Sequence, residues 1–556
     1  MKFNLFIFMV LGVLCANAQD IVNPEKINFY GGFESNSQWY LNDKGLKVAH
    51  PETPLRANSY LFVNLKYKEW NAGVQGESYE DEALLNFNPR YDKTDVATYF
   101  LQFKNEKIDL TAGYFYEQFG SGLLYRSWED RALGINNSLR GGRVIFKPTE
   151  YFTLKSIYGR QRTGFDISTS EIYGTDIEII LSEILKMKSS ELSLGMTYVG
   201  REEIVESIAN PNFNSLTNGY AARIDFSHSG MYFSTEYNYK SNDAIVEAPE
   251  QIENEFIKPG SALLMNVGYS KKGFGIDGTL RRLENMGFFS ERDAKGNAFN
   301  DRIMNFIPSL TKQHHYNLAN IYVYQAQPNV LLGDETLLKT GEIGGQLDVF
   351  YNFKKKTFFG GKYGSKLAIN LSNWNALAGT FYLPKKDYST EFLSFGKKYF
   401  SDYNIEFTKK WNAKLQTVFS YINQYYNIKL IEERDGLVNT NILGAEATYR
   451  FNDAKSIRVL GEHMWADSDK KNWAASTVEF NLNSKLSFFT ADMYNYGNDD
   501  PEARNHYYNI GGAFRQKSTR ISLSYGRQRG GLVCVGGVCR FVDKSSGLSL
   551  SLNTTF

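Results

Sequence analysis

The stretch of sequence that decides the fold is 548–556, which reads LSLSLNTTF. One face of this segment carries Leu548, Leu550, Leu552 and Phe556, and the other carries serine, asparagine and threonine side chains. A period of two residues is that of a β-strand, here with one apolar and one polar side. A half-buried strand of a soluble β-sandwich would alternate in the same way. The rest of the sequence must therefore decide between a sandwich and a membrane barrel.

An amphipathic strand that closes on phenylalanine resembles the carboxy-terminal signal of outer-membrane β-barrels. The barrel-assembly machinery reads this signal during biogenesis. The resemblance implies that Leu548, Leu550, Leu552 and Phe556 form such an assembly signal and that their face contacts outer-membrane lipid.

The composition is compatible with a membrane barrel. The 556 residues are 42% hydrophobic and 15% aromatic, yet the mean hydropathy is −0.40. A barrel has such an average because polar lumen residues dilute the apolar residues that face lipid. The 37 tyrosines and 40 phenylalanines would supply aromatic girdles at the membrane interfaces, and a large soluble β-core is the alternative. A net charge of +1 gives no reason to expect a nucleic-acid partner.

The first residues predict export. Lys2 precedes an apolar run and then Ala16-Asn17-Ala18, which is the pattern of a cleaved signal peptide at residues 1–18. Cys15 follows a leucine rather than the small residue that precedes a lipidated cysteine, so we expect plain cleavage after Ala18. No later run approaches the roughly 18 apolar residues of a transmembrane helix. An exported chain of this kind can still be integral to a membrane as a closed barrel.

Strand-like alternation recurs along the chain. In Leu61–Lys68 the odd positions are apolar and most even positions are polar. Ile343–Phe353 and Thr519–Gln528 repeat the pattern. One such segment is weak evidence for a strand, but the repetition is strong evidence for an all-β protein.

The connections between these segments alternate between short and long. Short turns are expected at Trp70-Asn71, Asn105-Glu106, Ser227 to Gly230, Lys271 to Gly273, Asn452 to Lys455 and Gln516 to Ser518. Long polar loops are expected at Leu41 to Leu55, Glu117 to Arg140, Arg201 to Thr217, Ser241 to Gly260, Glu284 to Thr340 and Asn375 to Glu391. Short turns at one end and long loops at the other are typical of bacterial outer-membrane barrels, and a soluble sandwich has no need of them.

The sequence therefore predicts a transmembrane antiparallel up-and-down β-barrel of about 24 strands, within roughly 22 to 26. Thirteen strand segments end at Arg282 and eleven more follow from Gly341, which gives the even total that paired up-and-down strands require. Residues 19–556 would form this one domain, with long loops at 117–140 and 284–340. The apolar segment Tyr316 to Gln325 would break the parity as a strand, so we place it inside the second loop, folded over or into the lumen.

Two cysteines remain after signal-peptide removal, Cys534 and Cys539, and they flank a Val-Gly-Gly-Val segment. Exported proteins fold in an oxidising compartment, and a Gly-Gly turn can bring the two Cα atoms within disulfide distance. We expect a disulfide, with two inert thiols as the alternative. Its ring would be small, so the expected role is to fix the shape of an exposed loop rather than to add global stability.

The loop at 117–140 combines glycines, arginines and large apolar residues. Glycines permit turns that would strain other residues, and Arg126, Glu129, Asp130 and Arg131 could pair among themselves. We interpret the segment as a loop that dips into the lumen and narrows it, and an ordered surface loop is the alternative. The residues predicted to form this constriction are Phe119, Gly120, Gly122, Arg126, Trp128, Arg131 and Arg140.

Three motifs together resemble an uncharacterised, porin-like family of Bacteroidota outer-membrane β-barrels. They are the run from Phe119-Gly120-Ser121-Gly122 to Gly141, the segment Gly360-Gly361-Lys362-Tyr363-Gly364, and Cys534 to Arg540 with the final phenylalanine. The similarity spans essentially the whole mature chain and implies a barrel in the cell outer membrane. It implies no activity and no catalytic residues.

The function expected from the sequence is porin-like passage of solutes across the outer membrane. A barrel well above eight strands leaves either a channel or a plugged lumen. The alternative is a non-enzymatic integral subunit of an outer-membrane assembly or secretion complex, with other outer-membrane proteins as partners. We expect no enzyme activity and no catalytic, cofactor-binding or metal site. The six histidines are scattered apart from His314-His315, and phosphate-loop, CxxC and HExxH patterns are absent.

Overall fold

The computed structural model describes residues 26–204, 213–247, 251–292, 302–331, 337–382 and 387–556. Residues 1–18, where the signal peptide is expected, lie outside the described residues, as does Cys15. Within the described part of the chain, no helix is long and apolar enough to cross a membrane.

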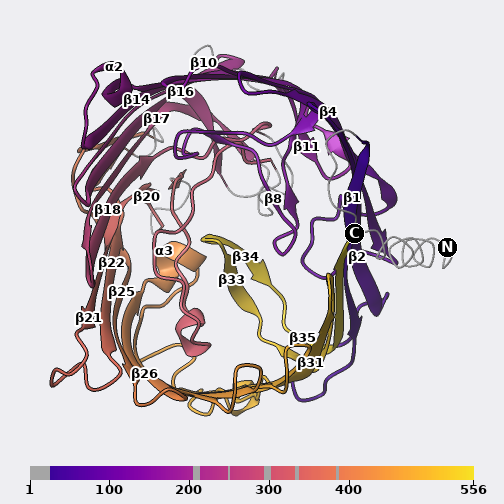
Figure 1. The fold of residues 1–556 in the computed structure, drawn as a ribbon, viewed down its shortest axis with the longest axis vertical. Helices are drawn as coiled ribbons and strands as arrows, with labels where there is room; N and C mark the ends of the chain where they lie inside the picture. Colours follow the sequence, from indigo (N-terminus) through magenta and orange to yellow (C-terminus); the bar gives the residue numbers. More distant parts are fainter. Residues whose placement is uncertain (1–25, 205–212, 248–250, 293–301, 332–336, 383–386) are drawn as a thin grey trace.

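A closed antiparallel barrel of 24 strands accounts for most of the described residues (Figure 1). Its first part consists of β1 (Asn28–Tyr40), β2 (Leu55–Tyr67), β3 (Trp70–Glu80), β4 (Thr94–Lys104), β5 (Ile108–Phe115), β10 (Leu139–Thr149), β11 (Phe152–Thr163), β13 (Glu171–Ile180), β14 (Ser190–Glu202), β15 (Leu216–His228), β16 (Met231–Glu247), β17 (Gln251–Lys271) and β18 (Phe274–Glu284). Its second part consists of β21 (Glu342–Phe353), β22 (Ser365–Asn375), β25 (Lys398–Lys410), β26 (Leu415–Tyr426), β27 (Val438–Arg450), β28 (Ser456–Ala466), β29 (Trp473–Asn481), β30 (Leu486–Tyr494), β31 (Asn509–Gln516), β32 (Thr519–Gln528) and β35 (Ser545–Thr555).

The ring closes between the first and last strands. β1 pairs with β35 in antiparallel register from Gly32 opposite Thr555 to Tyr40 opposite Gly547. The backbone N–H and C=O of Phe556 both bond to Gly31, at 3.0 Å each. The predicted fold class, the strand number and the amphipathic last strand are therefore confirmed.

Side chains alternate between a polar interior and an apolar exterior. In β32, Ile521, Leu523 and Tyr525 are 41%, 54% and 37% exposed on the outer surface. Ser524, which lies between two of them, lines a cavity inside the ring. This is the period of two that the sequence showed, with apolar side chains turned outward on this strand and polar ones turned inward.

Short turns and long connections alternate around the ring, as predicted, with two corrections. Trp70 and Asn71 already belong to β3, and the turn lies at 68–69. The long loop expected at Ser241 to Gly260 is largely strand, because β16 and β17 extend beyond the wall as a paired hairpin. Polar residues in this extension gave it the composition of a loop, but backbone pairing decides its conformation.

Shorter elements complete the fold. The helices of the described residues are α2 (Leu181–Ile184), α3 (Ile428–Glu432) and the 3-10 turns η2 (Leu318–Asn320) and η3 (Pro501–Ala503). The two-stranded pieces in the connections are β6 (Gln118–Phe119) with β7 (Tyr125–Arg126), β8 (Glu129–Asp130) with β9 (Ile135–Asn136), β19 (Val330–Leu331) with β20 (Lys339–Thr340), β23 (Gly379–Tyr382) with β24 (Asp387–Thr390), and β33 (Gly531–Val535) with β34 (Val538–Val542). A further short strand, β12 (Asp166–Ile167), pairs with the end of β11.

Candidate functional site: the barrel lumen

Three connections fold into the interior of the ring. We call residues 116–138, the described residues of 285–341 (285–292, 302–331 and 337–341) and residues 529–544 the first, second and third lumen segments. Figure 1 shows β8 of the first, β20 of the second and the β33–β34 hairpin of the third inside the ring of strands, together with α3. These segments fill much of the interior at the end of the barrel that carries the long connections.

The first lumen segment packs against the wall with its apolar side chains. Phe119, Leu124 and Tyr125 are each 1% exposed and belong to a cluster with wall residues of β10, β11, β13 and β14. The turn at Gly120 has a φ of +50°, and a Cβ there would lie 2.4 Å from the Glu236 carboxylate of β16. Glycine at this position lets the Ser121 N–H and hydroxyl both donate to Glu236 at 2.8 Å.

Arg131 ties the same segment to the opposite side of the wall. It donates to Glu34 of β1 at 2.9 Å, to Gln75 of β3 at 3.2 Å and to Glu129 at 3.2 Å. Burial opposes its charge, but the Glu129 and Glu34 carboxylates outweigh this and raise the pKa of Arg131. The expected pairing of Arg131 with Glu129 is thus present.

Three other predicted constriction residues do not bond to the described wall strands through ion pairs. Arg126 makes no ion pair with the described residues, and its guanidinium lies 4.0 Å from the Phe306 ring centre. Trp128 packs edge-on against Phe306. Arg140 was predicted as part of the constriction, but it belongs to β10 and is exposed on the outer face. The reason is the strand alternation, which turns Leu139 inward and Arg140 outward.

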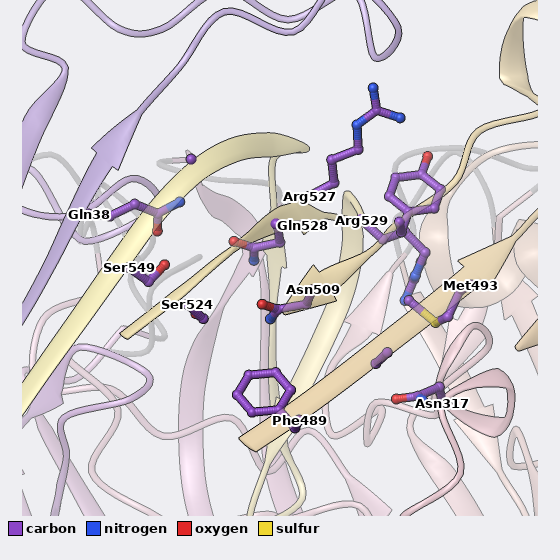
Figure 2. Close-up of a pocket in the computed structure, with 14 residues that line it drawn as sticks. Gln38, Asn317, Phe489, Met493, Asn509, Ser524, Arg527, Gln528, Arg529 and Ser549 are labelled. Carbon is purple, nitrogen blue, oxygen red and sulfur yellow. The ribbon is translucent and has the colours of Figure 1, made fainter. Parts of the chain in front are cut away.

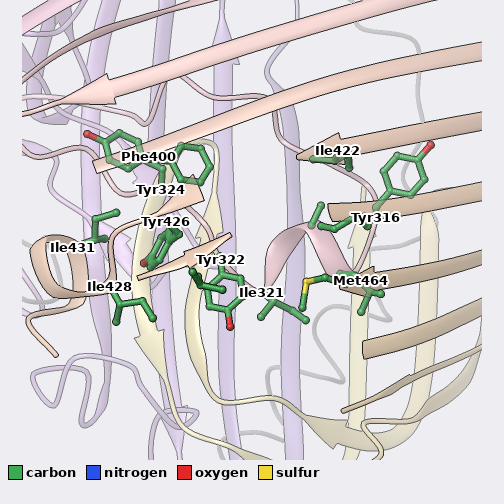
Figure 3. Packing of buried hydrophobic residues seen from close by; sticks show 14 of the residues in the cluster. Tyr316, Ile321, Tyr322, Tyr324, Phe400, Ile422, Tyr426, Ile428, Ile431 and Met464 are labelled. Carbon is green, nitrogen blue, oxygen red and sulfur yellow. The ribbon is translucent and has the colours of Figure 1, made fainter. Parts of the chain in front are cut away.

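The second lumen segment forms the largest buried cluster of the described residues (Figure 3). The predicted placement of 316–325 inside this loop is confirmed, because the segment is a 3-10 turn with flanking coil rather than a barrel strand. Tyr324 stacks on Phe400 of β25 at 5.4 Å between ring centres. Glu462 of β28 accepts hydrogen bonds from the backbone N–H groups of Asn317 at 3.0 Å and Leu318 at 2.9 Å.

The third lumen segment is a hairpin closed by the predicted disulfide between Cys534 and Cys539. Its turn is exposed in part, as expected, at Val535 and Gly536. Gly537, with a φ of +82°, lies against Pro308, and its C=O accepts from the Ser309 N–H at 2.8 Å. The disulfide thus shapes a hairpin that contacts the second lumen segment.

The segments also hold one another. Arg126 N–H donates to the Met304 C=O at 2.8 Å, and Phe306 N–H donates to the Gly122 C=O at 2.9 Å. Arg540 of the third segment donates to the C=O of Leu133 in the first at 2.8 Å. The three segments therefore behave as one packed body within the lumen.

Buried ion pairs link wall strands to one another and to these segments, and sequence analysis did not find them. Arg162 of β11 bonds Glu77 of β3 through both carboxylate oxygens, with 1% of each side chain exposed. Arg281 of β18 bonds Glu342 of β21 at 2.6 Å. A further cluster joins Lys240, Asp243, Arg201, Arg292 and Glu203. Its members come from distant parts of the chain, so no local spacing could have indicated them.

Two adjoining cavities of about 360 and 370 Å³ remain between the lumen segments and the wall. They share Asn317, Met493, Gln528 and Arg529 as lining residues. Figure 2 shows Arg529 extending toward Met493 and Asn317, while Arg527 points away from them. β30, β31, β32 and β35 form the wall of the first cavity.

Arg529 is the cation without an acidic partner at this place. Two of its N–H groups donate to the backbone C=O of Gly530 at 3.0 Å and Asn320 at 2.9 Å. No carboxylate among the described residues lies within ion-pair distance, and burial lowers the pKa of Arg529. A guanidinium nevertheless stays protonated and has five N–H donors, so three remain for other acceptors.

His314 lines the second cavity and bonds Asp402 at 2.9 Å through Nε2. Its Nδ1 has no hydrogen-bond partner within the described chain. No group of three or more His, Cys, Asp or Glu side chains in the described ranges is placed to hold a metal ion.

No curated protein matches the sequence. Among solved structures, the chain is similar to the translocation pore of the P pilus usher PapC, with 8% identity over 95% of this chain and 99% of that chain and a TM-score of 0.42. The siderophore receptor PirA from Pseudomonas aeruginosa gives 7% identity, 96% and 81% coverage and a TM-score of 0.39. The outer membrane transporter YddB from Escherichia coli gives 9%, 96%, 81% and 0.38. The chain belongs to the family of unknown function DUF6029, whose model matches residues 1–556.

Proposed function

We propose that the protein spans the outer membrane with its 24 strands after export directed by residues 1–18. A closed barrel satisfies its backbone hydrogen bonds without an edge, which is what a strand protein needs in lipid. Its outer surface is apolar along the strands, as β32 illustrates. Exposure of this apolar surface to water would be unfavourable, whereas lipid chains would cover it.

Aromatic residues at the short-turn end support this placement. Trp70 and Phe103 pack at 5.1 Å next to the turns that bound β3 and β4. Trp411 lies in the turn after β25 and is 50% exposed, and Phe358, in the turn after β21, is 91% exposed. Amphipathic aromatic rings gather where the hydrocarbon meets the headgroups, so these residues would mark one membrane interface.

The function that the geometry supports best is restricted passage of small solutes through the lumen, without catalysis. One observation carries this proposal. The lumen segments obstruct a barrel that would otherwise be wide, yet they leave two adjoining cavities. The first lies beside β30, β31, β32 and β35, and the second lies between the second and third lumen segments and β25 and β26. A 24-strand wall cannot fill its interior with wall side chains alone, so the chain itself sets the width of the passage.

Single-channel recording in planar bilayers tests the proposal. The intact barrel should conduct, but far less than an open pore of this strand number. Replacing residues 120–138 with a short Gly-Ser linker should raise the conductance severalfold, with heat-modifiable gel migration showing that the barrel still assembles. An intact protein and a variant that are both closed would refute solute passage.

The extent of the lumen packing favours a second candidate, a non-enzymatic integral subunit of an outer-membrane assembly. The first and second segments are bonded to the wall, and the third is bonded to both of them, which suits a structural role as well as a narrow passage. Affinity purification from native membranes in mild detergent would decide it. Recovery of the protein alone would count against this candidate.

A further inference from the structure

Arg529 lies where the two cavities meet. The role inferred for it below rests on the proposed passage of solutes. Its side chain lines both cavities, and both of its described hydrogen bonds go to backbone oxygens. Any molecule that moves from one cavity to the other meets this guanidinium.

The other charged groups that line these cavities are already engaged. Arg527 is bonded to Asp43 at 2.6 and 2.7 Å. Lys312 lies 3.5 Å from Glu406, and Asp402 accepts from His314. Among the charged side chains that line these cavities, Arg529 is the cation that no described carboxylate engages.

A second cation adds to this positive charge. Lys470 lies in the turn after β28, and its ammonium is 5.4 Å from the ring centre of Tyr322, which lines the second cavity. Burial and the Arg529 charge together lower the pKa of Lys470 to about 8. A positive charge on Arg529 is therefore felt by a neighbouring group, as it would be by a mobile anion.

The rest of the lining suits a small polar molecule. The first cavity has amide and hydroxyl side chains, and Phe489, Met493 and Tyr507 add apolar surface. In the second, His314 Nδ1 has no described partner and can take part in a hydrogen bond with a bound molecule. Guanidinium N–H groups match the two oxygens of a carboxylate or phosphate.

One other cavity has the opposite charge balance. This cavity of about 380 Å³ beside the first lumen segment is lined by four carboxylates and two cations, which are Asp176, Glu178, Asp225, Glu236, Lys155 and Arg223. An anion would be disfavoured there. The junction at Arg529 thus differs in charge from this cavity.

We propose that Arg529 binds the anionic group of the solutes that pass, and that the protein selects small organic anions carrying a carboxylate or phosphate. The guanidinium takes up the anionic oxygens with its free N–H groups at the junction of the cavities. Passage is then anion-selective although the chain as a whole is nearly neutral.

The test is the reversal potential of the full-length barrel in planar bilayers under a potassium chloride gradient. The native protein should prefer chloride to potassium, and inorganic phosphate should reduce its chloride current in a concentration-dependent way. Arg529→Gln should lower the chloride preference severalfold and weaken the phosphate block, whereas Arg529→Lys should retain the preference. Heat-modifiable migration confirms that each variant assembles.

Arg520→Gln is the matched control. Arg520 lies on the same strand and, by alternation, on the same face as Ser524, but it does not line either cavity. Its loss should change selectivity much less. Cation preference in the native protein would overturn the role of Arg529 in anion selection, and so would an equal effect of Arg529→Gln and Arg520→Gln. Either result would leave the proposed passage of solutes intact. If neither the native protein nor any variant conducts, both the proposed passage of solutes and the anion selectivity are overturned. If Arg529→Gln fails to assemble, the reversal potential and phosphate block of the native protein still test the anion selectivity.

Discussion

Replacing Arg131 with alanine should loosen the first lumen segment from the barrel wall. The native side chain connects this segment to β1 through Glu34 and to β3 through Gln75. Its guanidinium also lies 4.6 Å from the ring centre of Tyr60 on β2. One truncation therefore removes contacts to three neighbouring strands and leaves Glu34 without its cation.

The magnitude follows from partial burial. The Arg131 and Glu34 side chains are 21% and 24% exposed. Breaking a fully buried pair costs about 3–5 kcal/mol and breaking an exposed pair costs up to about 1 kcal/mol. The free-energy cost of breaking a mostly buried pair lies between these values, at about 1.5–3 kcal/mol. A cost of this size makes detachment of the segment roughly 10 to 100 times more frequent.

Single-channel recording measures this change directly. Arg131→Ala should show transient openings of larger conductance, more frequent than in the native protein by that factor. Arg160→Ala is the control, because the Arg160–Glu171 pair at 2.8 Å has the same chemistry but is exposed. Unchanged openings in Arg131→Ala, or the same change in both variants, would refute the view that ion pairs hold the segment in the lumen.

Three further outcomes are expected. Phe556→Asp should lower the yield of heat-modifiable barrel, because Phe556 pairs with Gly31 at the closing seam and its ring lies over that glycine; an unchanged yield would contradict this and the predicted assembly signal. Lys470→Met should raise the melting temperature at pH 7 and lose this advantage near pH 10. The folded pKa of about 8 lies below the 10.5 of free lysine, so the native protein binds this proton more weakly than the unfolded chain and gains stability as pH rises between the two values. The melting temperatures of both proteins across this range check the sign, and an advantage that persists at pH 10 would refute it. Reduction of Cys534–Cys539 should leave gel migration of the assembled barrel unchanged but alter the current noise, since the hairpin contacts the second lumen segment; loss of the folded form would refute a local role.

The wall could be predicted from sequence because its determinants are local. Alternation with a period of two specifies each strand, and the contrast of short turns with long loops specifies their direction. The requirement for an even number of strands was needed at Tyr316 to Gln325, because the apolar residues of this segment alone would have predicted a strand that is not there. The prediction of a long loop at Ser241 to Gly260 was wrong because it relied on polar composition, and polar residues do not prevent strand pairing beyond the wall.

The interior could be predicted only in part. The apolar residues Phe119 and Trp128 indicated that loop 117–140 needs a buried environment, and the structure places both within the barrel. The outward position of Arg140 depends on where β10 begins, and the partners of Arg126, Met304 and Phe306, are distant in the sequence. The Arg162–Glu77 pair is equally non-local. Sequence patterns report periodicity, whereas these contacts are fixed by closure of the ring.

Closure also explains why charged wall groups hold the lumen segments in addition to the apolar clusters. A wall that presents polar side chains inward cannot hold a filling body by apolar packing alone, so the segments are attached through carboxylates such as Glu236 and Glu462 that accept backbone N–H groups. These attachments lie on β16 and β28, and Arg131 adds β1 and β3, so the filling braces parts of the wall that lie far apart around the ring. The first cavity remains beside β30, β31, β32 and β35, where the lumen segments leave the wall uncovered, and the second adjoins it at Arg529. The same bracing that narrows the barrel thus confines the proposed passage to the side where Arg529 lies, and the proposed selectivity depends on the cations at this junction rather than on the net charge of the chain.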